Sequence, residues 1–295
     1  MTTDLIVGLG EVLFDVLPNG RKLGGAPANY AYHVCQFGFD ARLLSAIGND
    51  EAGQEVLDTF ERIGLKSHLA KVDYPTGTAV ATLDSNGVAS YDFREGAAWD
   101  NIPWSNELQQ LASRTRAVAF GSLAQRSKTS RDTIRRFLES MPDANTLKIF
   151  GINIRKDFYT RQIIEQSLQV CNMVKLNDEE LDLLGRLFGY PGKDKQASCR
   201  RVMEDFGIDT LILTCGVNGS HVLAAEGVSS LPTPRVTVAD TIGAGDSFTA
   251  AFSASLLLGK TLGQAHRKAT EVSAYVCSQS GAMPKLPSAM LDNWD

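Results

Sequence analysis

The sequence predicts an α/β fold in which one mostly parallel, doubly wound sheet is covered by helices on both faces. Short apolar segments typical of buried strands alternate with helical patterns along most of the chain. The length of 295 residues and a hydrophobic fraction of 43% suffice for the core of one large domain, with or without a small appendage. Residues 69–94 break the alternation and predict an additional small antiparallel sheet.

The first elements follow in β-α-β order. Residues 5–10 and 43–48 are predicted strands, and the helix between them covers 27–37, because proline favours a first helical turn and Gly38 stops the helix. The same alternation continues through most of the remaining chain. Further strands are predicted at 117–120, 147–152, 173–176 and 210–213, and further helices at 130–141, 163–170 and from Asp178 onward.

A hairpin is predicted where the alternation stops. Asn86-Gly87 lies between two strand-like segments, 80–83 and 88–93, and Asn-Gly is the strongest short-range hairpin signal. A small antiparallel sheet inserted in an α/β domain would be a lid over an active site. An ordinary surface hairpin would give the same pattern.

Composition argues against several kinds of partner. The formal net charge is -5, and no run of Lys or Arg is long enough for an obvious nucleic-acid arm. The five cysteines are scattered, without a zinc-binding spacing, and are expected to be reduced thiols. Neither a signal peptide nor a membrane span is recognisable in the sequence, so we expect a cytoplasmic protein without nucleic-acid or membrane partners.

The segment 240–246, Asp-Thr-Ile-Gly-Ala-Gly-Asp, is a candidate phosphate-binding turn. Its two glycines let backbone N–H groups approach an anion, and the apolar helix behind them would point its positive end at that anion. Asp246 would lie in the first helical turn, where a carboxylate suits proton abstraction from a nucleophile that attacks phosphorus. A helix start with convenient glycines explains the segment equally well by itself.

Residues near the N-terminus are candidates for binding hydroxyl groups. Gly24-Gly25 precedes the first helix, and Asn29 in its first turn offers both a donor and an acceptor to a sugar. Glu11 and Asp15 follow the carboxyl end of the first strand, where open α/β sheets bind ligands. A helix cap and a solvated strand end are the respective structural alternatives.

Two later loops are candidates for nucleotide contacts. Asn177 and Glu180 open a helix in a capping arrangement, and the functional alternative is that Glu180 holds Mg²⁺ water while Asn177 or Lys175 faces phosphate. The loop 214–219 could line a nucleotide or be a simple hairpin turn. Gly8-Leu9-Gly10 begins like a dinucleotide fingerprint, but Leu13 replaces its third glycine, which disfavours an oxidoreductase.

In their order along the chain, these motifs resemble those of the ribokinase-like, or PfkB-type, carbohydrate kinases. Four are present: Gly-Gly-x-x-x-Asn, Asn-x-x-Glu, Thr-x-Gly-x-x-Gly and Asp-Thr-x-Gly-Ala-Gly-Asp. The resemblance implies a single ribokinase-like domain over 1–295, with an inserted β lid formed by roughly 12–24 and 66–100. It also implies transfer of the γ-phosphoryl group of ATP to a sugar hydroxyl with Mg²⁺, and homodimerisation through the lid.

The same resemblance implies roles for single residues. Asp246 would be the catalytic base, beside an anion hole formed by Gly243, Ala244 and Gly245, and Glu180 would support Mg²⁺. Activating K⁺ would bind near Asp240 and Ile242 and the segment 278–281. The nucleotide would be lined by Lys175, Asn177, Thr214, Gly216, Gly219 and Asp240, and the sugar by Glu11, Asp15, Gly24, Gly25, Asn29, Arg94, Asn153 and Arg155.

Several stretches are most similar to fructokinases, which predicts conversion of fructose to fructose 6-phosphate. These stretches are 10–15, 24–29, 93–100, 121–126 and 153–155. Gly151 stands where fructokinases usually have Asp, which leaves the role of Arg155 open. The alternatives are a related kinase of ribose, 2-keto-3-deoxygluconate or a sugar phosphate, for which Arg94 and Arg155 would supply cations, and a non-catalytic sugar or nucleotide sensor.

Overall fold

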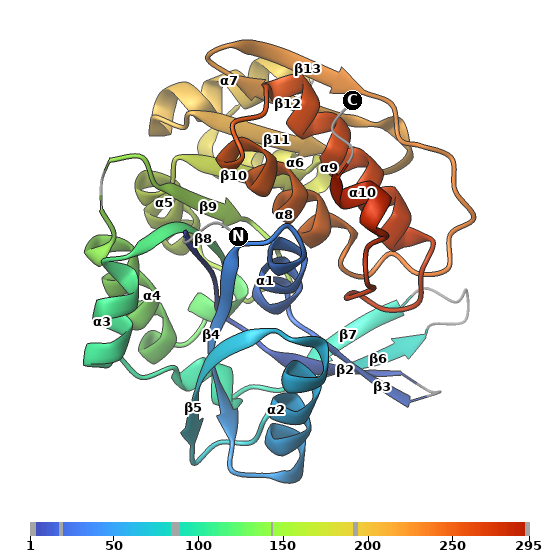
Figure 1. The fold of residues 1–295 in the computed structure, drawn as a ribbon. Coiled ribbons are helices and arrows are strands. Elements are labelled where there is room, and N and C mark those ends of the chain that lie inside the picture. The colour runs from blue at the N-terminus through green and yellow to red at the C-terminus, as the bar shows by residue number, and fades with distance from the viewer. Residues whose placement is uncertain (1–3, 18–19, 84–88, 143, 191–193, 293–295) are drawn as a thin grey trace.

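The predicted α/β architecture is confirmed by the computed structural model, which describes residues 4–17, 20–83, 89–142, 144–190 and 194–292. A large sheet runs through the molecule between two helical layers, and a smaller sheet lies at one end of it (Figure 1). Within the described ranges, no helix is both long enough and apolar enough to cross a bilayer.

Nine strands of the described residues form the larger sheet, in the order β13-β12-β11-β10-β9-β8-β1-β4-β5. Neighbours from β5 to β11 are parallel, whereas β12 and β13 pair antiparallel at one edge. The parallel strands therefore end along a common edge, where α/β sheets bind ligands. Their bounds are β1 Leu5–Leu9, β4 Asp40–Gly48, β5 Lys66–Val72, β8 Thr115–Gly121, β9 Leu147–Gly151, β10 Met173–Asn177, β11 Thr210–Thr214, β12 Ser220–Ala224 and β13 Gly227–Leu231.

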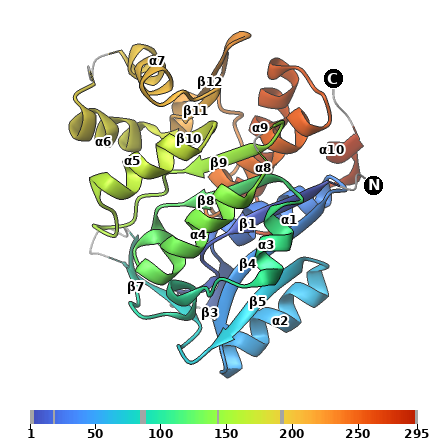
Figure 2. The same ribbon diagram turned by 90° about the vertical axis from the view of Figure 1, so that its left-hand side faces the viewer.

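Helices cover both faces of this sheet, because its central strands are apolar on both sides. Val7 of β1 belongs to one core cluster with Phe137, whereas the adjacent Ile6 belongs to another with Phe252. Figure 2 shows α4 and α5 crossing the front of the sheet. The first layer comprises α3 Asn106–Ala112, α4 Lys128–Ser140, α5 Arg161–Val170, α6 Asp178–Phe188 and α7 Lys195–Phe206. The second layer comprises α1 Ala26–Gln36, α8 Ala244–Leu257 and α9 Leu262–Cys277. Beside β4 lies α2 Glu51–Ile63, and α10 Ser288–Asp292 lies near the C-terminus.

The smaller sheet has the strand order β3-β2-β6-β7. Its bounds are β2 Leu13–Leu17, β3 Gly20–Gly24, β6 Gly77–Leu83 and β7 Ala89–Phe93. The β6 and β7 strands pair antiparallel as the hairpin pattern predicts, while Asn86-Gly87 lies outside the described residues. The predicted lid range 66–100 also includes β5, which instead pairs parallel with β4 at the edge of the larger sheet.

One glycine brings α1 close to the end of β1. A Cβ atom on Gly8 would lie 2.0 Å from the carbonyl oxygen of Pro27, so only glycine allows this approach. Next to it, α1 packs against α8, where the hydroxyls of Tyr30 and Ser253 are 3.1 Å apart. The N-termini of both helices consequently reach the ligand-binding edge of the sheet.

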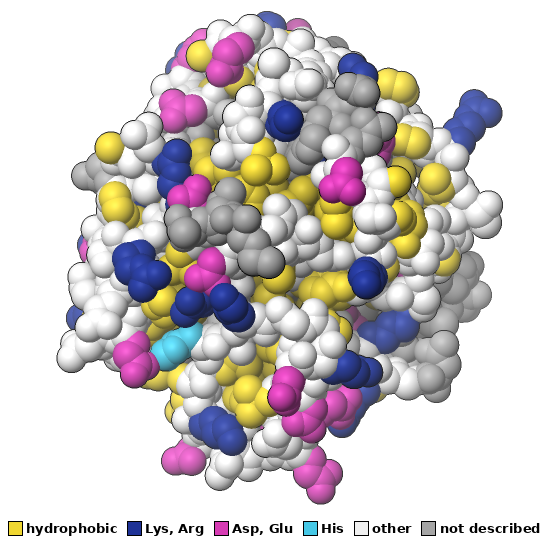
Figure 3. Space-filling view, viewed as in Figure 1, with side chains coloured by type: hydrophobic (Ala, Val, Ile, Leu, Met, Phe, Trp, Pro, Cys, Tyr) yellow, Lys and Arg dark blue, Asp and Glu magenta, His cyan; other side chains and the backbone are white. Residues whose placement is uncertain are grey.

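The surface drawn in Figure 3 intersperses basic side chains with acidic ones. Dark blue Lys and Arg groups have magenta Asp and Glu groups close by over most of this face. This face therefore presents no extended surface of a single charge.

Candidate active site

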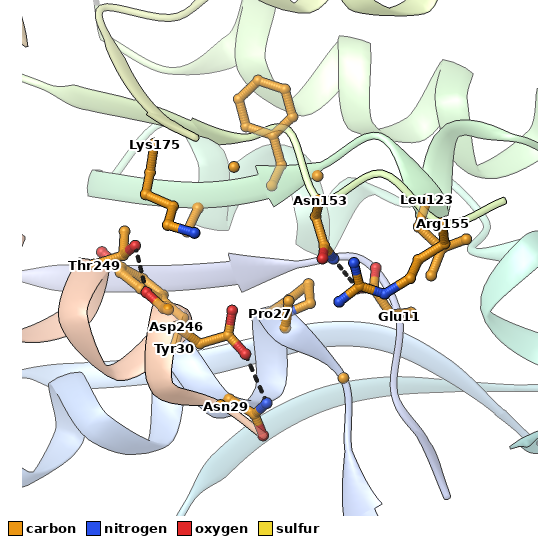
Figure 4. Close-up of a pocket in the computed structure, with 18 of the residues that line it drawn as sticks. Glu11, Pro27, Asn29, Tyr30, Leu123, Asn153, Arg155, Lys175, Asp246 and Thr249 are labelled. Carbon is orange, nitrogen blue, oxygen red and sulfur yellow. Dashed lines mark hydrogen bonds between the residues drawn. The ribbon is translucent and has the colours of Figure 1, made fainter. Parts of the chain in front are cut away.

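A cavity of about 360 Å³ lies at the carboxyl ends of β1, β8, β9 and β10 (Figure 4). The N-termini of α1 and α8 enter it from one side, and Leu13 and Asp15 of β2 and Phe93 of β7 line it from the smaller sheet. Most of its polar lining was predicted from the sequence. The polar side chains that line it include Glu11, Asp15, Asn29, Asn153, Arg155, Lys175, Asn177, Glu180, Asp246 and Thr249.

The turn before α8 has the geometry of an anion site. Gly243 is the N-cap with a φ of 76°, and a Cβ atom there would lie 2.7 Å from the Cβ of Ala282. The Asp240 carboxylate accepts a 3.0 Å hydrogen bond from the Ile242 amide and thereby fixes the turn. No side-chain hydrogen bond caps α8 in the described structure, and although the Ala244 amide donates to the Thr241 carbonyl at 3.3 Å, the amides of Gly243 and Gly245 have no such bond among the described residues and are available to an anion.

Asp246 lies in the first turn of α8 and lines the cavity. Asn29 Nδ2 donates a 2.8 Å hydrogen bond to its Oδ2. Burial raises the pKa of Asp246, and the Asn29 hydrogen bond and the positive charges of Lys175 and Arg155 oppose this rise only in part. An aspartate with a raised pKa that faces a cavity is suited to accept a proton.

Lys175 approaches the same turn from β10. A Cβ atom on Gly245 would lie 2.9 Å from Lys175 Nζ, so glycine makes room for the ammonium group beside the first turn of α8. Figure 4 shows this side chain pointing from its strand toward Asp246 and Thr249. An ammonium group and free helix amides together can neutralise phosphate oxygens.

Glu11 and Asp15 are buried carboxyl groups on the opposite side of the cavity. Burial raises the pKa of Glu11 to about 7 and that of Asp15 to about 6, although the charge of Arg155 lowers both. Glu11 Oε1 accepts a long 3.5 Å contact from the Asn153 amide, drawn as a dashed line in Figure 4.

Two buried acceptor atoms in the cavity are without partners among the described residues. They are Oε2 of Glu11 and Oδ1 of Asn29. An unpaired buried acceptor costs on the order of 1–3 kcal/mol, a cost that a hydroxyl donor from a ligand would remove. These atoms therefore favour a ligand rich in hydroxyl groups.

Glu180 completes the capping box of α6, whose N-cap is Asn177. Its Oε2 accepts from the Asn177 amide at 2.9 Å and its Oε1 from the Ile154 amide at 3.1 Å, while the Asn177 side chain accepts from the Glu180 amide at 2.8 Å. The capping alternative from the sequence is thus present. Each carboxylate oxygen retains a lone pair, so Glu180 fits contact with Mg²⁺ through the metal's water shell, and the described residues contain no cluster of three or more Asp, Glu, His or Cys side chains able to hold a metal directly.

The remaining predicted residues lie around this cavity. Gly25 lines it, whereas Gly24 packs beside Asp15, whose Oδ2 would be 2.7 Å from a Cβ atom at position 24. Thr214 is paired with Asn177 at the end of β11, and the described cavity lining includes neither Thr214 nor the loop residues Gly216 and Gly219. Asp240 and Ala244 flank lining residues of the turn.

Arg94 lies in a neighbouring cavity of about 890 Å³. Phe93 lines both cavities, whereas Arg94, predicted to contact the sugar, is not part of the described lining of the first cavity. The second cavity carries both signs of charge, from Asp92, Arg94, Glu95, Asp100, Arg126, Arg131, Lys156 and Asp157.

Sequence reasoning missed several residues of the first cavity. Tyr30 and Thr249 contribute hydroxyl groups, and Thr241 and Ile242 contribute the turn itself. Thr249 follows Asp246 by three residues, about one helical turn, so helical spacing could have indicated it, whereas Tyr30 directly follows Asn29 and has no such signal.

Comparison with known proteins identifies the family. The model of the "pfkB family carbohydrate kinase" matches residues 11–289, nearly the whole chain. The chain belongs to the pfkB family of carbohydrate kinases. This pfkB-family kinase is 30% identical to a fructokinase of Salmonella typhimurium over 84% of this chain and 83% of that protein. It is 26% identical to an ATP-dependent 6-phosphofructokinase of Thermoanaerobacterium thermosaccharolyticum, over 96% of this chain and 90% of the other.

A solved structure confirms the ribokinase-like fold of this pfkB-family kinase. Aminoimidazole riboside kinase from Salmonella enterica, complexed with aminoimidazole riboside and an ATP analog, superposes with a TM-score of 0.80. The match covers 98% of this chain and all of the other, at 23% sequence identity. The three relatives are named for three different substrates, so the similarity establishes a sugar kinase without selecting the sugar.

Proposed function

We propose that this pfkB-family kinase transfers the γ-phosphoryl group of ATP to a hydroxyl of fructose, forming fructose 6-phosphate. The observation that carries the proposal is the placement of Asp246 in one cavity with unpaired sugar-type acceptors on Glu11 and Asn29. A hydroxyl-rich ligand bound in this cavity would therefore lie beside both the proposed base and the proposed phosphate-binding turn.

In the proposed reaction, Asp246 accepts the proton of the attacking sugar hydroxyl. The oxygen forms a bond to the γ-phosphorus while the bond from that phosphorus to the β–γ bridging oxygen breaks, and ADP leaves. The amides of Gly243, Ala244 and Gly245 and the Lys175 ammonium stabilise the negative charge of the transferring group. Mg²⁺, when bound with ATP, neutralises phosphate charge, and Glu180 would hold it through water.

Glu11, Asp15 and Asn29 orient the sugar in this proposal. Carboxylate acceptors bind hydroxyl donors strongly when buried, and the Asn29 amide already holds the base. Asn153 and Arg155 border the same side, and Arg155 lowers the pKa of both Glu11 and Asp15. The loop 153–155 therefore keeps these carboxyl groups able to ionise.

A larger or phosphorylated substrate is a second candidate, favoured by the cavity beyond Phe93. Arg94 and Lys156 line that cavity next to the sugar site. Phosphate on the far end of a sugar would need such cations. Of the relatives named above, the Salmonella fructokinase corresponds to the first candidate and the 6-phosphofructokinase to the second.

An ATP-consumption assay over a panel of sugars tests the proposal. We expect ADP release with fructose to exceed that with ribose, 2-keto-3-deoxygluconate and fructose 6-phosphate. Asp246→Asn should reduce turnover by about 100-fold or more and leave ATP and fructose binding nearly intact. Near-normal turnover of this variant would disprove the role of Asp246, and preference for fructose 6-phosphate would favour the second candidate.

Two other expectations remain predictions. The smaller sheet would act as a lid over the sugar and would pair with a second copy to form a homodimer. We also retain a cytoplasmic location as a prediction from the sequence.

A further inference from the structure

Lys22 on β3 connects the smaller sheet to the turn that precedes α8. Its Nζ atom donates to Asp240 Oδ2 at 3.3 Å and to Ser280 Oγ at 2.9 Å. These partners are 218 and 258 residues away along the chain. The side chain of Lys22 is 36% exposed and that of Asp240 15%, so the ion pair is partly shielded from water.

Asp240 carries this contact into the phosphate-binding turn. Its Oδ1 accepts from the Ile242 amide, and its Oδ2 also accepts from the Gly281 amide at 3.2 Å. The segment beyond Gly281 presses on Gly243, because Ala282 leaves no room for a Cβ atom there. One carboxylate thus joins Lys22, the turn 240–243 and the segment 278–282.

On its own sheet, Lys22 is paired with Asp15 of β2. Residues directly opposite in an antiparallel pair project to the same face of a sheet. The charge of Lys22 lowers the pKa of Asp15, whereas the charge of Asp240 raises it. Lys22 therefore lies between a carboxyl group of the proposed sugar site and the carboxylate that shapes the phosphate turn.

We propose that Lys22 is a positioning residue that couples sugar binding under the smaller sheet to the ordering of the phosphate-binding turn. The inference rests on the proposed function of the cavity. A sugar that holds Asp15 and β2 in place also holds β3, so the Lys22 ammonium stays on Asp240 and Ser280. The turn then keeps the conformation that ATP phosphate requires.

The proposal also explains the site predicted for K⁺. That prediction placed a monovalent cation on the backbone near Asp240 and Ile242 and on the segment 278–281, and Lys22 Nζ contacts side chains of the same two segments. A tethered ammonium group supplies the same charge, so an added cation would be unnecessary. Removal of the ammonium would leave an anionic space that free NH₄⁺ or K⁺ can enter.

Lys22→Met tests this role, because it keeps most of the aliphatic stem and removes the charge. Arg21→Met is a matched control, since Arg21 is the adjacent residue of β3 and its salt bridge to Glu55 also joins the smaller sheet to the rest of the domain. Lys22→Arg keeps a cation. Thermal unfolding of each variant should first establish that it is folded.

The measurement is the affinity of ATP with and without saturating fructose. We expect fructose to tighten ATP binding at least about 5-fold in the unsubstituted protein, a typical coupling, and not at all in Lys22→Met. Addition of 100 mM NH₄Cl or KCl should restore part of the coupling to Lys22→Met alone. Lys22→Arg should keep much of the coupling between fructose and ATP binding, and Arg21→Met should keep all of this coupling.

Hydrogen exchange without ligand keeps this test separate from the proposed function. Amides of 240–247 should exchange faster in Lys22→Met than in Arg21→Met, whether or not any sugar is phosphorylated. Equal exchange and equal coupling in these two variants would overturn the proposal, as would faster exchange with unchanged coupling. If no sugar is phosphorylated while exchange responds as expected, the proposed function fails and the structural link remains.

Discussion

Asn29 on α1 donates a 2.8 Å hydrogen bond to Asp246 on α8, although 217 residues separate them in the chain. The contact joins the proposed sugar site to the proposed base. The second polar atom of Asn29, Oδ1, is buried without a partner among the described residues and is free to accept a sugar hydroxyl. One amide can therefore orient the nucleophile and support the group that takes its proton.

Asn29→Ala should move the acid limb of the pH–rate profile to higher pH. Burial already raises the pKa of Asp246, and the Asn29 hydrogen bond lowers it by stabilising the ionised form. Without that bond the pKa rises further, and a base that must be ionised loses activity at a higher pH. The profile of kcat/KM against pH measures this shift. Tyr30→Phe removes the hydroxyl contact with Ser253, which also joins α1 to α8, and should leave the acid limb in place.

Glu11→Gln should change how stability depends on pH. The folded-state pKa of Glu11 is about 7 against an ordinary 4.5, so the folded protein holds this proton more tightly than the unfolded chain. The resulting stabilisation is complete below pH 4.5 and is lost as pH rises to about 7, by at most roughly 1.4 kcal/mol per pH unit. The glutamine variant should therefore gain much more stability relative to the unsubstituted protein at pH 8 than at pH 5.

Urea unfolding at the two pH values measures this difference. Asp15→Asn should also gain stability relative to the unsubstituted protein as pH rises, over a lower pH range of 3.8 to about 6. Substitution of exposed Glu61 by Gln is the control and should leave the difference between pH 5 and pH 8 unchanged. An equal change for Glu11→Gln and Glu61→Gln would contradict the raised pKa of Glu11.

Gly243→Ala should weaken ATP binding as well as folding. Both Gly243 and Gly259 have φ near 75°, a conformation that costs alanine about 1–2 kcal/mol. A Cβ atom at Gly243 also meets Ala282, whereas nothing lies within 4 Å of one at Gly259. Gly259→Ala should consequently lose stability without losing ATP affinity. Equal ATP affinities of the two variants would show that the turn does not bind phosphate.

Glu180→Gln should raise the Mg²⁺ concentration needed for half-maximal rate. An amide cannot accept both backbone hydrogen bonds that the Glu180 carboxylate accepts, and it carries no charge for the metal's water shell. Chelation with EDTA should abolish turnover, and excess Mg²⁺ should restore it. Asp194→Asn alters another capping carboxylate, outside the described cavity lining, and should change stability without changing the Mg²⁺ requirement.

Local patterns predicted the elements that position the site. The predictions of β1, α1, β4 and the later alternation depend on apolar runs, Pro27 and glycine stops, which lie within each segment, but the predicted β-α-β start omitted β2 and β3, which lie between β1 and α1. The motifs then named residues that the fold brings into one cavity, including Asn29, Lys175 and Asp246. The parallel pairing in the larger sheet follows because strands that alternate with helices are joined by helical crossovers, whereas the order of the strands was not predicted.

Features that depend on how the smaller sheet sits against the domain were not predictable. Lys22 has no sequence signal for its contact with Asp240, because that contact requires β3 to reach the turn before α8. Arg94 directly follows Phe93, the last residue of β7, and the sequence does not indicate which of the two cavities that share Phe93 it lines. The alternation that predicted a lid from residue 69 is also typical of an edge strand. Residues 69–72 belong to β5, which is the edge strand of the larger sheet.

The strand order has a consequence for synthesis of the chain on the ribosome. From β8 through β13, each new strand adds beside the one made just before it, so the sheet can grow outward as the polypeptide emerges. The proposed base cannot join this assembly until α8 is made and packs on α1, formed more than two hundred residues earlier. We expect nascent chains arrested before residue 240 to form part of the sheet but to bind no ATP, which a ribosome-bound ATP-binding assay would reveal. Phosphoryl transfer would then become possible only after α8 has been made and packed on α1, and a chain arrested before residue 240 would consume no ATP.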